Sequence, residues 1–190
     1  MYHFIFDLDG TLIDSTDAII ESFGVAFETF GHATPDDDAI KKLIGYPLDL
    51  MFTMLGIDSL AANDYVMAYK EHYRLISRKK TTLLPLAHEA IRHAAKIATL
   101  GIVTTKTARY SEELLEHLGV MHHFKVLIGR ESVTYPNPHP EPIQKALLAL
   151  NADPAQTWMV GDTPMDLMCA KEAGVKSIGV LCGYSTKYEL

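Results

Sequence analysis

Cysteine is scarce in this chain of 190 residues, which has only two, Cys169 and Cys182. Both stand in apolar surroundings, so they suggest neither a disulfide framework nor a zinc site. Long apolar runs are also missing, since no stretch approaches the roughly 20 residues that span a bilayer. The first residues have no basic leader of the kind that signal peptides carry. We therefore expect a cytoplasmic protein without a membrane partner.

Excess positive charge is missing as well. The formal net charge is −7, with 17 Lys and Arg against 24 Asp and Glu. This balance argues against nucleic acid or an anionic membrane as the main partner. The length allows one core domain, alone or with a small insert. We expect a small-molecule partner, and the oligomeric state stays open between monomer and dimer.

What the sequence does contain is an apolar, aromatic run at residues 2–6 that ends in two acids, Asp7 and Asp9, followed by Gly10. The run is typical of a buried strand that enters a turn. Carboxylates at such a place are costly unless something compensates their charge. A divalent cation does so, and Mg²⁺ takes carboxylate, water and phosphate oxygens. Gly10 permits a tight turn and a close backbone approach to a ligand.

Residues 15–80 show four helical patterns and no convincing strand, which predicts a small antiparallel bundle. The patterns cover about residues 15–30, 34–44, 47–56 and 59–77, the second with Thr34 as its N-cap and Pro35 at its first position. Tyr69 and Tyr73 are expected in the core of the bundle. Arg78-Lys79-Lys80, followed by Thr81-Thr82, is expected to form a solvated basic hinge.

From Leu83 onward, helical patterns alternate with short apolar runs. This alternation predicts a parallel sheet with right-handed crossovers, and therefore an α/β domain made of residues 1–14 and 81–190, with residues 15–80 as an insert. The expected strands cover residues 101–105, 124–128, 157–160 and 177–180, and the expected helices cover residues 88–98, 111–118 (capped by Ser111), 140–150 and 166–173.

Polar residues follow several of these strands at the carboxyl end, where open parallel sheets bind their ligands. They are Asp7 and Asp9, then Thr104 and Thr105, then Asp162. The architecture places these residues on one rim although they are far apart in the sequence. Carboxylates for a metal and a nucleophile, with hydroxyls for phosphate oxygens, suit phosphoryl transfer.

The stretch Asp7-Leu8-Asp9-Gly10-Thr11-Leu12, with Asp14-Ser15, resembles the first motif of the haloacid dehalogenase superfamily in its phosphatase form. The resemblance implies a Rossmann-like core with helices on both faces of the sheet, an α-helical cap inserted after the first strand, and Mg²⁺ as cofactor. It implies that Asp7 is the nucleophile, which forms an aspartyl-phosphate and binds the metal. It also implies that Asp9 is the general acid and base, with its backbone carbonyl on the metal.

The resemblance extends to two later motifs. It implies that Thr104 is the phosphate-binding hydroxyl, with Thr105 beside it. In Gly161-Asp162-Thr163-Pro164-Met165-Asp166, it implies that Asp162 is a metal ligand and that Asp166 is a ligand or its supporting partner. The spacing of these two acids also fits an ordinary helix start, in which acids cap backbone amides.

The third motif departs from the family pattern. Asn137 stands before Pro138-His139-Pro140, where the superfamily has a Lys that pairs with the nucleophile and the phosphate. Asn can donate hydrogen bonds but carries no charge. Three accounts are open: Asn137 serves as a weaker donor, Lys106 reaches into the site, or the site is impaired. Both Asn137 and Lys106 are therefore candidates for substrate binding.

Within the superfamily, the chain is most similar to the phosphoglycolate phosphatase and pyrophosphatase branch. This implies Mg²⁺-dependent hydrolysis of a small phosphomonoester or of pyrophosphate, with a small phosphorylated metabolite as partner. The alternatives are a sugar-phosphate mutase and a binding or regulatory protein on an impaired scaffold. A dehalogenase is disfavoured, because that branch lacks the second acid, here Asp9. His122 and His123 could suggest a metal site, but adjacent side chains rarely share a ligand face, which favours a solvated loop.

Overall fold

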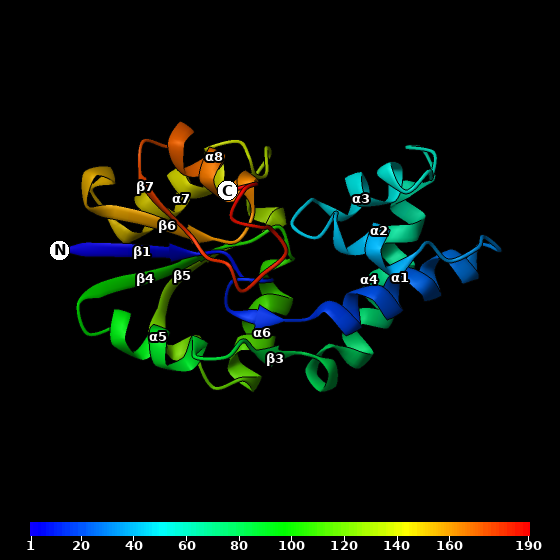
Figure 1. Cartoon of the computed structure of the whole chain (residues 1–190), viewed down its shortest axis with the longest axis horizontal. Helices are drawn as coiled ribbons and strands as arrows, with labels where there is room; N and C mark the ends of the chain where they lie inside the picture. Colours follow the sequence, from blue (N-terminus) through cyan, green and yellow to red (C-terminus); the bar gives the residue numbers. More distant parts are fainter. The chain divides into compact units, whose positions relative to one another are not determined.

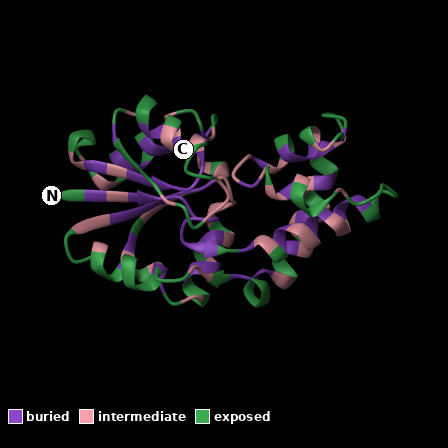
Figure 2. Cartoon of the chain, viewed as in Figure 1, coloured by how far each residue is buried: buried purple, intermediate pink, exposed green.

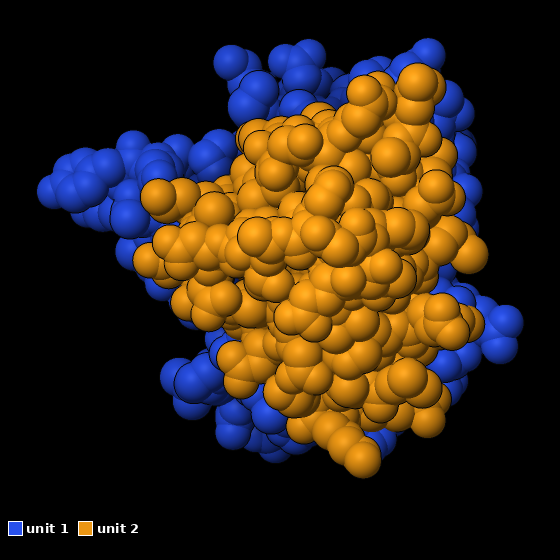
Figure 3. All heavy atoms as spheres, turned by 90° about the vertical axis from the view of Figure 1, so that its right-hand side faces the viewer, with its two compact units in different colours: residues 1–14, 82–190 blue, residues 15–81 orange.

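The computed structural model describes residues 1–190. The chain divides into two compact units, residues 1–14 with residues 82–190 and residues 15–81, which Figure 3 shows in separate colours. No helix in either unit combines the length and the apolar character needed to cross a bilayer. The two units are described in turn.

The first unit is built on a parallel sheet of five strands in the order β5-β4-β1-β6-β7. The strands are β1 (Tyr2–Phe6), β4 (Ala98–Val103), β5 (Phe124–Ile128), β6 (Thr157–Gly161) and β7 (Lys176–Gly179). The first strand of the chain is thus the central strand of the sheet, which explains its apolar composition. Because all five strands run in the same direction, their carboxyl ends form one edge (Figure 1).

Helices cover both faces of this sheet, as predicted. They are α5 (Ala87–Ala94), α6 (Ala108–His117), α7 (Glu141–Leu150) and α8 (Pro164–Glu172), with short 3₁₀ turns η1 (Met121–His123), η2 (Arg130–Ser132) and η3 (Pro154–Gln156). Helices α5 and α6 lie on one face and α7 and α8 on the other (Figure 1).

Two separate hydrophobic cores hold these layers together. Successive side chains of a strand point to opposite faces, so Phe6 packs in the core under α5 and α6 while Ile5 packs in the core under α7 and α8. Full burial of such a side chain stabilises the fold by roughly 1.5–3 kcal/mol. Strand β1 is exposed at its amino end and buried toward its carboxyl end (Figure 2), whereas β7 at the edge of the sheet is exposed along its length.

A short antiparallel ribbon, which the sequence analysis did not predict, joins β2 (Ile13–Asp14) to β3 (Thr82–Leu83). It pairs the segment that leaves the first unit with the segment that returns to it. The predicted basic hinge is wrong for residues 78–80, because they form the last turn of α4 (Ala62–Lys80). Cations are stabilising at that end of a helix, and Lys80 also forms an ion pair with Glu21.

The second unit contains only helices: α1 (Thr16–Thr29), α2 (Asp37–Lys41), α3 (Leu48–Met54) and α4. Aromatic rings fill its core. The ring of Phe23 lies 4.6 Å from that of Phe52 and 5.0 Å from that of Tyr69. Tyr69 stacks on Tyr73 at 5.5 Å, and both are buried. The expectation that these tyrosines belong to the core of the bundle is confirmed.

Among the predicted boundaries that differ from the structure, three have a clear local reason. Helix α2 begins at Asp37 with Asp36 as its N-cap, so Thr34 and Pro35 precede it. Helix α6 begins at Ala108, and the Ser111 hydroxyl donates to the carbonyl of Thr107 from inside the helix, an alternative that serine takes besides capping. Strand β4 begins at Ala98, where a helix was predicted, because residues 98–100 pair with β1.

Candidate active site

The end of β1 positions the first two acids. The backbone N–H of Asp7 donates to the carbonyl of Val160 at 2.9 Å, which continues the pairing of β1 with β6 past the last residue of the strand. Gly10 then turns the chain with φ of +77°. A Cβ atom there would lie 2.4 Å from Oδ2 of Asp162, so both the backbone conformation and the space require glycine.

Three buried carboxylates meet beside this turn. Asp7, Asp162 and Asp166 each contribute an oxygen, and these oxygens lie within 4.8 Å of one another. They come from the ends of β1 and β6 and from the first turn of α8. The predicted convergence of the first and fourth motifs therefore exists in the structure. The side chain of Asp9 is not part of this group.

The three carboxylates are hard to ionise together. Burial, followed by the charges of Asp166, Asp162 and Asp9, raises the pKa of Asp7 well above its ordinary value. Burial also raises the pKa of Asp162, and it raises the pKa of Asp166 to about 6. Buried like charges repel strongly, and a divalent cation held by carboxylate oxygens removes that cost. The donor set fits Mg²⁺ in chemistry and in spacing.

Both oxygens of Asp162 are fixed by protein donors. The hydroxyl of Thr11 donates to Oδ1 at 2.9 Å, and the backbone N–H of Tyr184 donates to Oδ2 at 2.8 Å. The chain passes so close that a Cβ atom at Gly183 would lie 2.0 Å from that same Oδ2. Each carboxylate oxygen has a second lone pair, so Asp162 is held in place and can still bind a metal.

Asp166 has two roles in the structure. Its Oδ2 accepts from the backbone N–H of Thr163 at 3.1 Å and from the Thr163 hydroxyl at 2.7 Å, and these bonds cap helix α8. Its Oδ1 accepts from Nδ2 of Asn137 at 3.0 Å. Asp166 therefore both caps the start of helix α8 and belongs to the carboxylate group. Asn137 is buried and supplies a neutral donor to the group.

Lys106 lies next to the other acid. Its Nζ is 3.1 Å from Oδ2 of Asp9, and both side chains are largely buried. Its backbone N–H donates to the Thr104 hydroxyl at 3.2 Å, so the hydroxyl proton of Thr104 stays available for another acceptor. Thr105, between them in sequence, is half-buried. The predicted phosphate-binding segment thus lies beside Asp9, with Lys106 paired to that acid.

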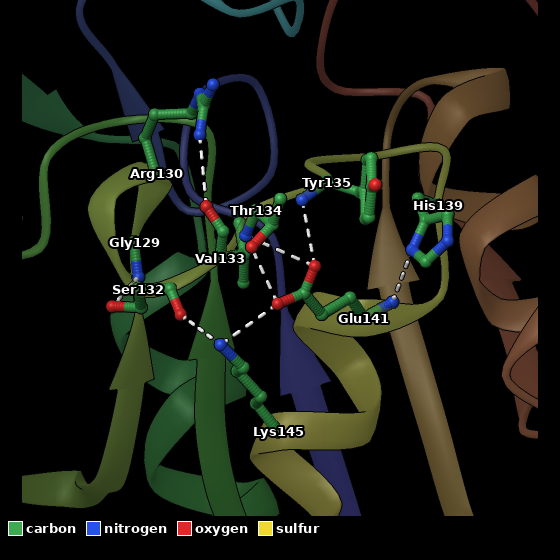
Figure 4. Close-up of polar contacts among 9 residues, drawn as sticks. All are labelled: Gly129, Arg130, Ser132, Val133, Thr134, Tyr135, His139, Glu141 and Lys145. Atoms are coloured by element: carbon green, nitrogen blue, oxygen red, sulfur yellow. Dashed lines mark hydrogen bonds and ion pairs between the residues drawn. The ribbon is translucent and has the colours of Figure 1, made fainter.

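The loop that carries Asn137 is anchored by Glu141, at the start of α7 (Figure 4). The carboxylate of Glu141 accepts from the backbone N–H groups of Tyr135 at 2.8 Å and Thr134 at 3.1 Å, and it pairs with Lys145 at 2.9 Å. These amides and the ammonium group lower the pKa of Glu141 to about 2. Two acids therefore hold this segment: Glu141 binds the backbone before Asn137, and Asp166 accepts a hydrogen bond from the Asn137 side chain.

Two residues at the site were not identified from the sequence. Thr11 lies inside the first motif but was given no role there. Tyr184 contributes through its backbone N–H, which every residue except proline has, so no side-chain pattern could have indicated it. Only the path of the chain after β7 places that amide on Asp162.

A parallel α/β core with a carboxylate group at the carboxyl edge of its sheet defines a class of metal-assisted hydrolases. The family model for haloacid dehalogenase-like hydrolases matches residues 4–180. The chain belongs to that family, and it is a hydrolase of the phosphatase type.

Individual relatives agree with this assignment. The chain is 34% identical over 195 residues to a protein of Dickeya dadantii named "Probable phosphatase IndB", covering 98% of this chain and 84% of the relative. It is 35% identical over 184 residues to the pyrophosphatase PpaX of Anoxybacillus flavithermus, covering 93% and 81%. A haloacid dehalogenase-like family hydrolase from Streptococcus pneumoniae has a similar structure, with a TM-score of 0.90, 26% identity and coverage of 100% and 89%.

Proposed function

We propose that the protein is a Mg²⁺-dependent phosphatase that hydrolyses a small phosphomonoester or pyrophosphate through a phosphorylated Asp7. The observation that carries the proposal is the group of three buried carboxylates within 4.8 Å of one another, because ionised carboxylates at such distances repel one another and a bound cation compensates that repulsion. Asp7, Asp162 and Asp166, with the backbone carbonyl of Asp9, would hold the ion. When bound, the ion neutralises the carboxylates and the phosphate oxygens.

The reaction divides between Asp7 and Asp9. An oxygen of Asp7 attacks phosphorus, and the bond between phosphorus and the leaving oxygen breaks. Asp9 gives its proton to that leaving oxygen. In the second half, Asp9 takes a proton from water, which attacks the phosphorus and returns Asp7 to a free carboxylate. Asp9 suits this role because its carboxylate lies outside the group that would hold the ion and is positioned by Lys106 at 3.1 Å.

Thr104 and Lys106 would bind the phosphoryl group. The Thr104 hydroxyl keeps its proton for a phosphate oxygen, since the bond that it already makes is one that it accepts. Lys106 is the cation next to this hydroxyl, and its charge opposes that of Asp9. Thr105 follows at the same edge of the sheet. Asn137 would hold Asp166 rather than supply charge, since it donates to Oδ1 of that residue.

The substrate class is limited to small phosphorylated compounds. PpaX relatives are named pyrophosphatases, and pyrophosphate and phosphomonoesters both present a terminal phosphoryl group on an oxygen leaving atom. The net charge of −7 disfavours nucleic acid as a substrate. We therefore propose a small phosphorylated metabolite as partner, Mg²⁺ as cofactor and a cytoplasmic location for the protein.

The proposal is tested by trapping the intermediate. The full chain is mixed with ³²P-labelled pyrophosphate or with labelled phosphomonoesters including phosphoglycolate, quenched in acid, and examined for label on the protein. Label and phosphate release are expected with Mg²⁺ and not with EDTA. Asp7→Asn should remove both, whereas the matched variant Asp38→Asn, an exposed acid on α2, should keep both. A folded protein that is neither labelled nor active with any of these compounds would disprove the proposal.

One observation favours a second candidate, a binding or regulatory protein on an impaired scaffold. The buried Asn137 supplies no positive charge where the family has a lysine, so the site faces a phosphate dianion with one cation fewer. That candidate predicts Mg²⁺ binding without phosphate release. A sugar-phosphate mutase would instead become labelled but release little phosphate. The same trapping experiment separates all three outcomes.

A further inference from the structure

A pocket lies in the first unit at the opposite edge of the sheet from the carboxylates. Its volume is about 440 Å³, within the range of pockets that bind small molecules. The turn before β4, the first residues of β4, η1 and the start of β5 line it. In Figure 1 this is the edge at which the amino end of β1 is marked. A strand of five residues separates the two edges by on the order of 15 Å.

The lining of this pocket is basic. Lys96, His122, His123 and Lys125 contribute side chains to it, and no Asp or Glu does. Neither lysine forms an ion pair within the chain. Two lysines without an acidic partner contrast with the net charge of −7 for the chain. An anion in the pocket would be attracted by both lysines, and no acid of the lining would oppose that attraction.

The two histidines add to this arrangement. Their rings lie 4.0 Å apart. The pKa of His123 is lowered by burial and then by the neighbouring His122 and His88, and no acid counteracts these effects. Neither ring belongs to a group of three side chains able to hold a metal ion. Both histidines lie in η1, and the structure shows this segment lining the pocket.

The pocket also has an apolar side. Ile97 lies next to Lys96 and is 65% exposed, and Ala98 continues the same wall. Pockets that combine apolar walls with a few convergent polar groups are suited to small organic ligands. A ligand with phosphate at one end and a ring at the other would contact both sides.

We propose that this pocket is a second ligand site that binds a small phosphorylated compound with an apolar or ring portion, of the size of a nucleoside monophosphate. Lys96, Lys125 and the two histidines contact the phosphate, and the ring packs on Ile97. The site shares no residue with the carboxylate group and does not depend on catalysis.

Calorimetry tests this with AMP as the probe and EDTA present, so that Mg²⁺-dependent binding at the carboxylate edge is suppressed. The double variant Lys96→Ala and Lys125→Ala should weaken AMP binding by at least about tenfold, as expected for two lost charge-assisted contacts. The control Lys171→Ala and Lys187→Ala removes the same charge from exposed positions outside the pocket, and it should bind like the wild type.

A third variant separates the two edges of the sheet. Lys106→Ala, at the carboxylate edge, should leave AMP binding in EDTA unchanged. Each substituted lysine of the pocket is exposed, so the variants are expected to fold. Circular dichroism is the control that checks this. The proposal is overturned if the wild type does not bind millimolar AMP, if the control double variant loses as much affinity as the pocket double variant, or if Lys106→Ala alone loses it.

Discussion

The two edges of the parallel sheet carry opposite charge and differ in burial. At the carboxyl edge, Asp7, Asp162 and Asp166 are buried and lie within 4.8 Å of one another. At the amino edge, Lys96 and Lys125 are exposed around a pocket of about 440 Å³. The same strands support both edges, so the difference comes from the connecting segments.

The two edges also differ in how the structure compensates their charges. Buried acids require a fixed partner, and the structure supplies one for both oxygens of Asp162 and both oxygens of Asp166, from Thr11, Tyr184, Asn137 and Thr163. Exposed bases need no such partners, because water screens them. Substitutions at the carboxyl edge should therefore change catalysis and metal binding strongly, and substitutions at the amino edge should change neither.

Among the variants that keep the proposed nucleophile Asp7, the largest effect is expected for Asp9→Asn. Removing a general acid and base lowers turnover by between about 10²- and 10⁴-fold. The loss should be smaller for p-nitrophenyl phosphate than for an alkyl phosphate, because nitrophenolate leaves without a proton. Steady-state kinetics with both substrates measure this. Equal losses for the two substrates would contradict the assignment of the acid role to Asp9.

The next effect concerns the segment that holds Asp162. Gly183→Ala places a Cβ atom 2.0 Å from Oδ2 of Asp162 and 2.4 Å from the carbonyl oxygen of Gly10, so the carboxylate must move. Displacing a group that orients a metal ligand weakens metal binding by roughly 10- to 100-fold. Mg²⁺ titration calorimetry measures the change.

Gly179→Ala is the matched control for that variant. Its Cβ atom would lie 3.2 Å from Leu190 Cδ1, the end of a flexible side chain, and at ordinary contact distances of 3.6 Å and 3.7 Å from Leu190 Cβ and Leu167 Cδ1. It should bind Mg²⁺ like the wild type. Equal Mg²⁺ affinity in the Gly183→Ala variant and its control would show that the segment does not position Asp162.

Asn137→Lys sharpens the comparison by adding the missing cation to the carboxyl edge. Turnover should rise by about an order of magnitude, the scale of one electrostatic stabiliser. Asn137→Gln is a suitable control, since it keeps a neutral donor. Unchanged turnover of the Lys variant at saturating Mg²⁺ would mean that compensation is already present, with Lys106 as the first residue to examine.

The smallest effect is a change of thermal stability with pH. The folded-state pKa values of Asp7 and Asp166 are raised above the ordinary 3.8, that of Asp166 to about 6. The folded state thus binds protons more tightly than the unfolded state, and this stabilising contribution is lost as pH rises through about 6. Mg²⁺ should therefore raise Tm more at pH 8 than at pH 5, by on the order of 5 °C. Scanning calorimetry with EDTA and with Mg²⁺ at both pH values tests this, and a shift independent of pH would contradict it.

Much of the fold was predictable because its signals are local. The run at residues 2–6 is apolar enough to indicate the central strand, and the strand at residues 124–128 was predicted with its observed bounds. The early start of β4 was not predictable in this way, because residues 98–100 join the sheet through pairing with β1. The ribbon between β2 and β3 also depends on two segments that meet only after the insert has folded.

The candidate site shows the same division. The motifs around Asp7 and Asp162 indicated acids at the ends of two strands, because charge after an apolar run is visible in the sequence. The partner of each carboxylate was not visible. Asn137 faces Asp166, Lys106 faces Asp9, and the Tyr184 amide faces Asp162, and these pairings follow from loops that approach the edge from separate parts of the chain.

The sequence by itself determined the α/β class, the helical insert and the acids that gather at one edge, since periodicity and strand-end charge depend on neighbouring residues alone. Only the tertiary structure decided which donor holds which oxygen and that exposed bases surround a pocket at the other edge. The reason is physical: hydrogen bonds and charge interactions act over a few ångströms in space, and the order of residues along the chain does not specify those distances.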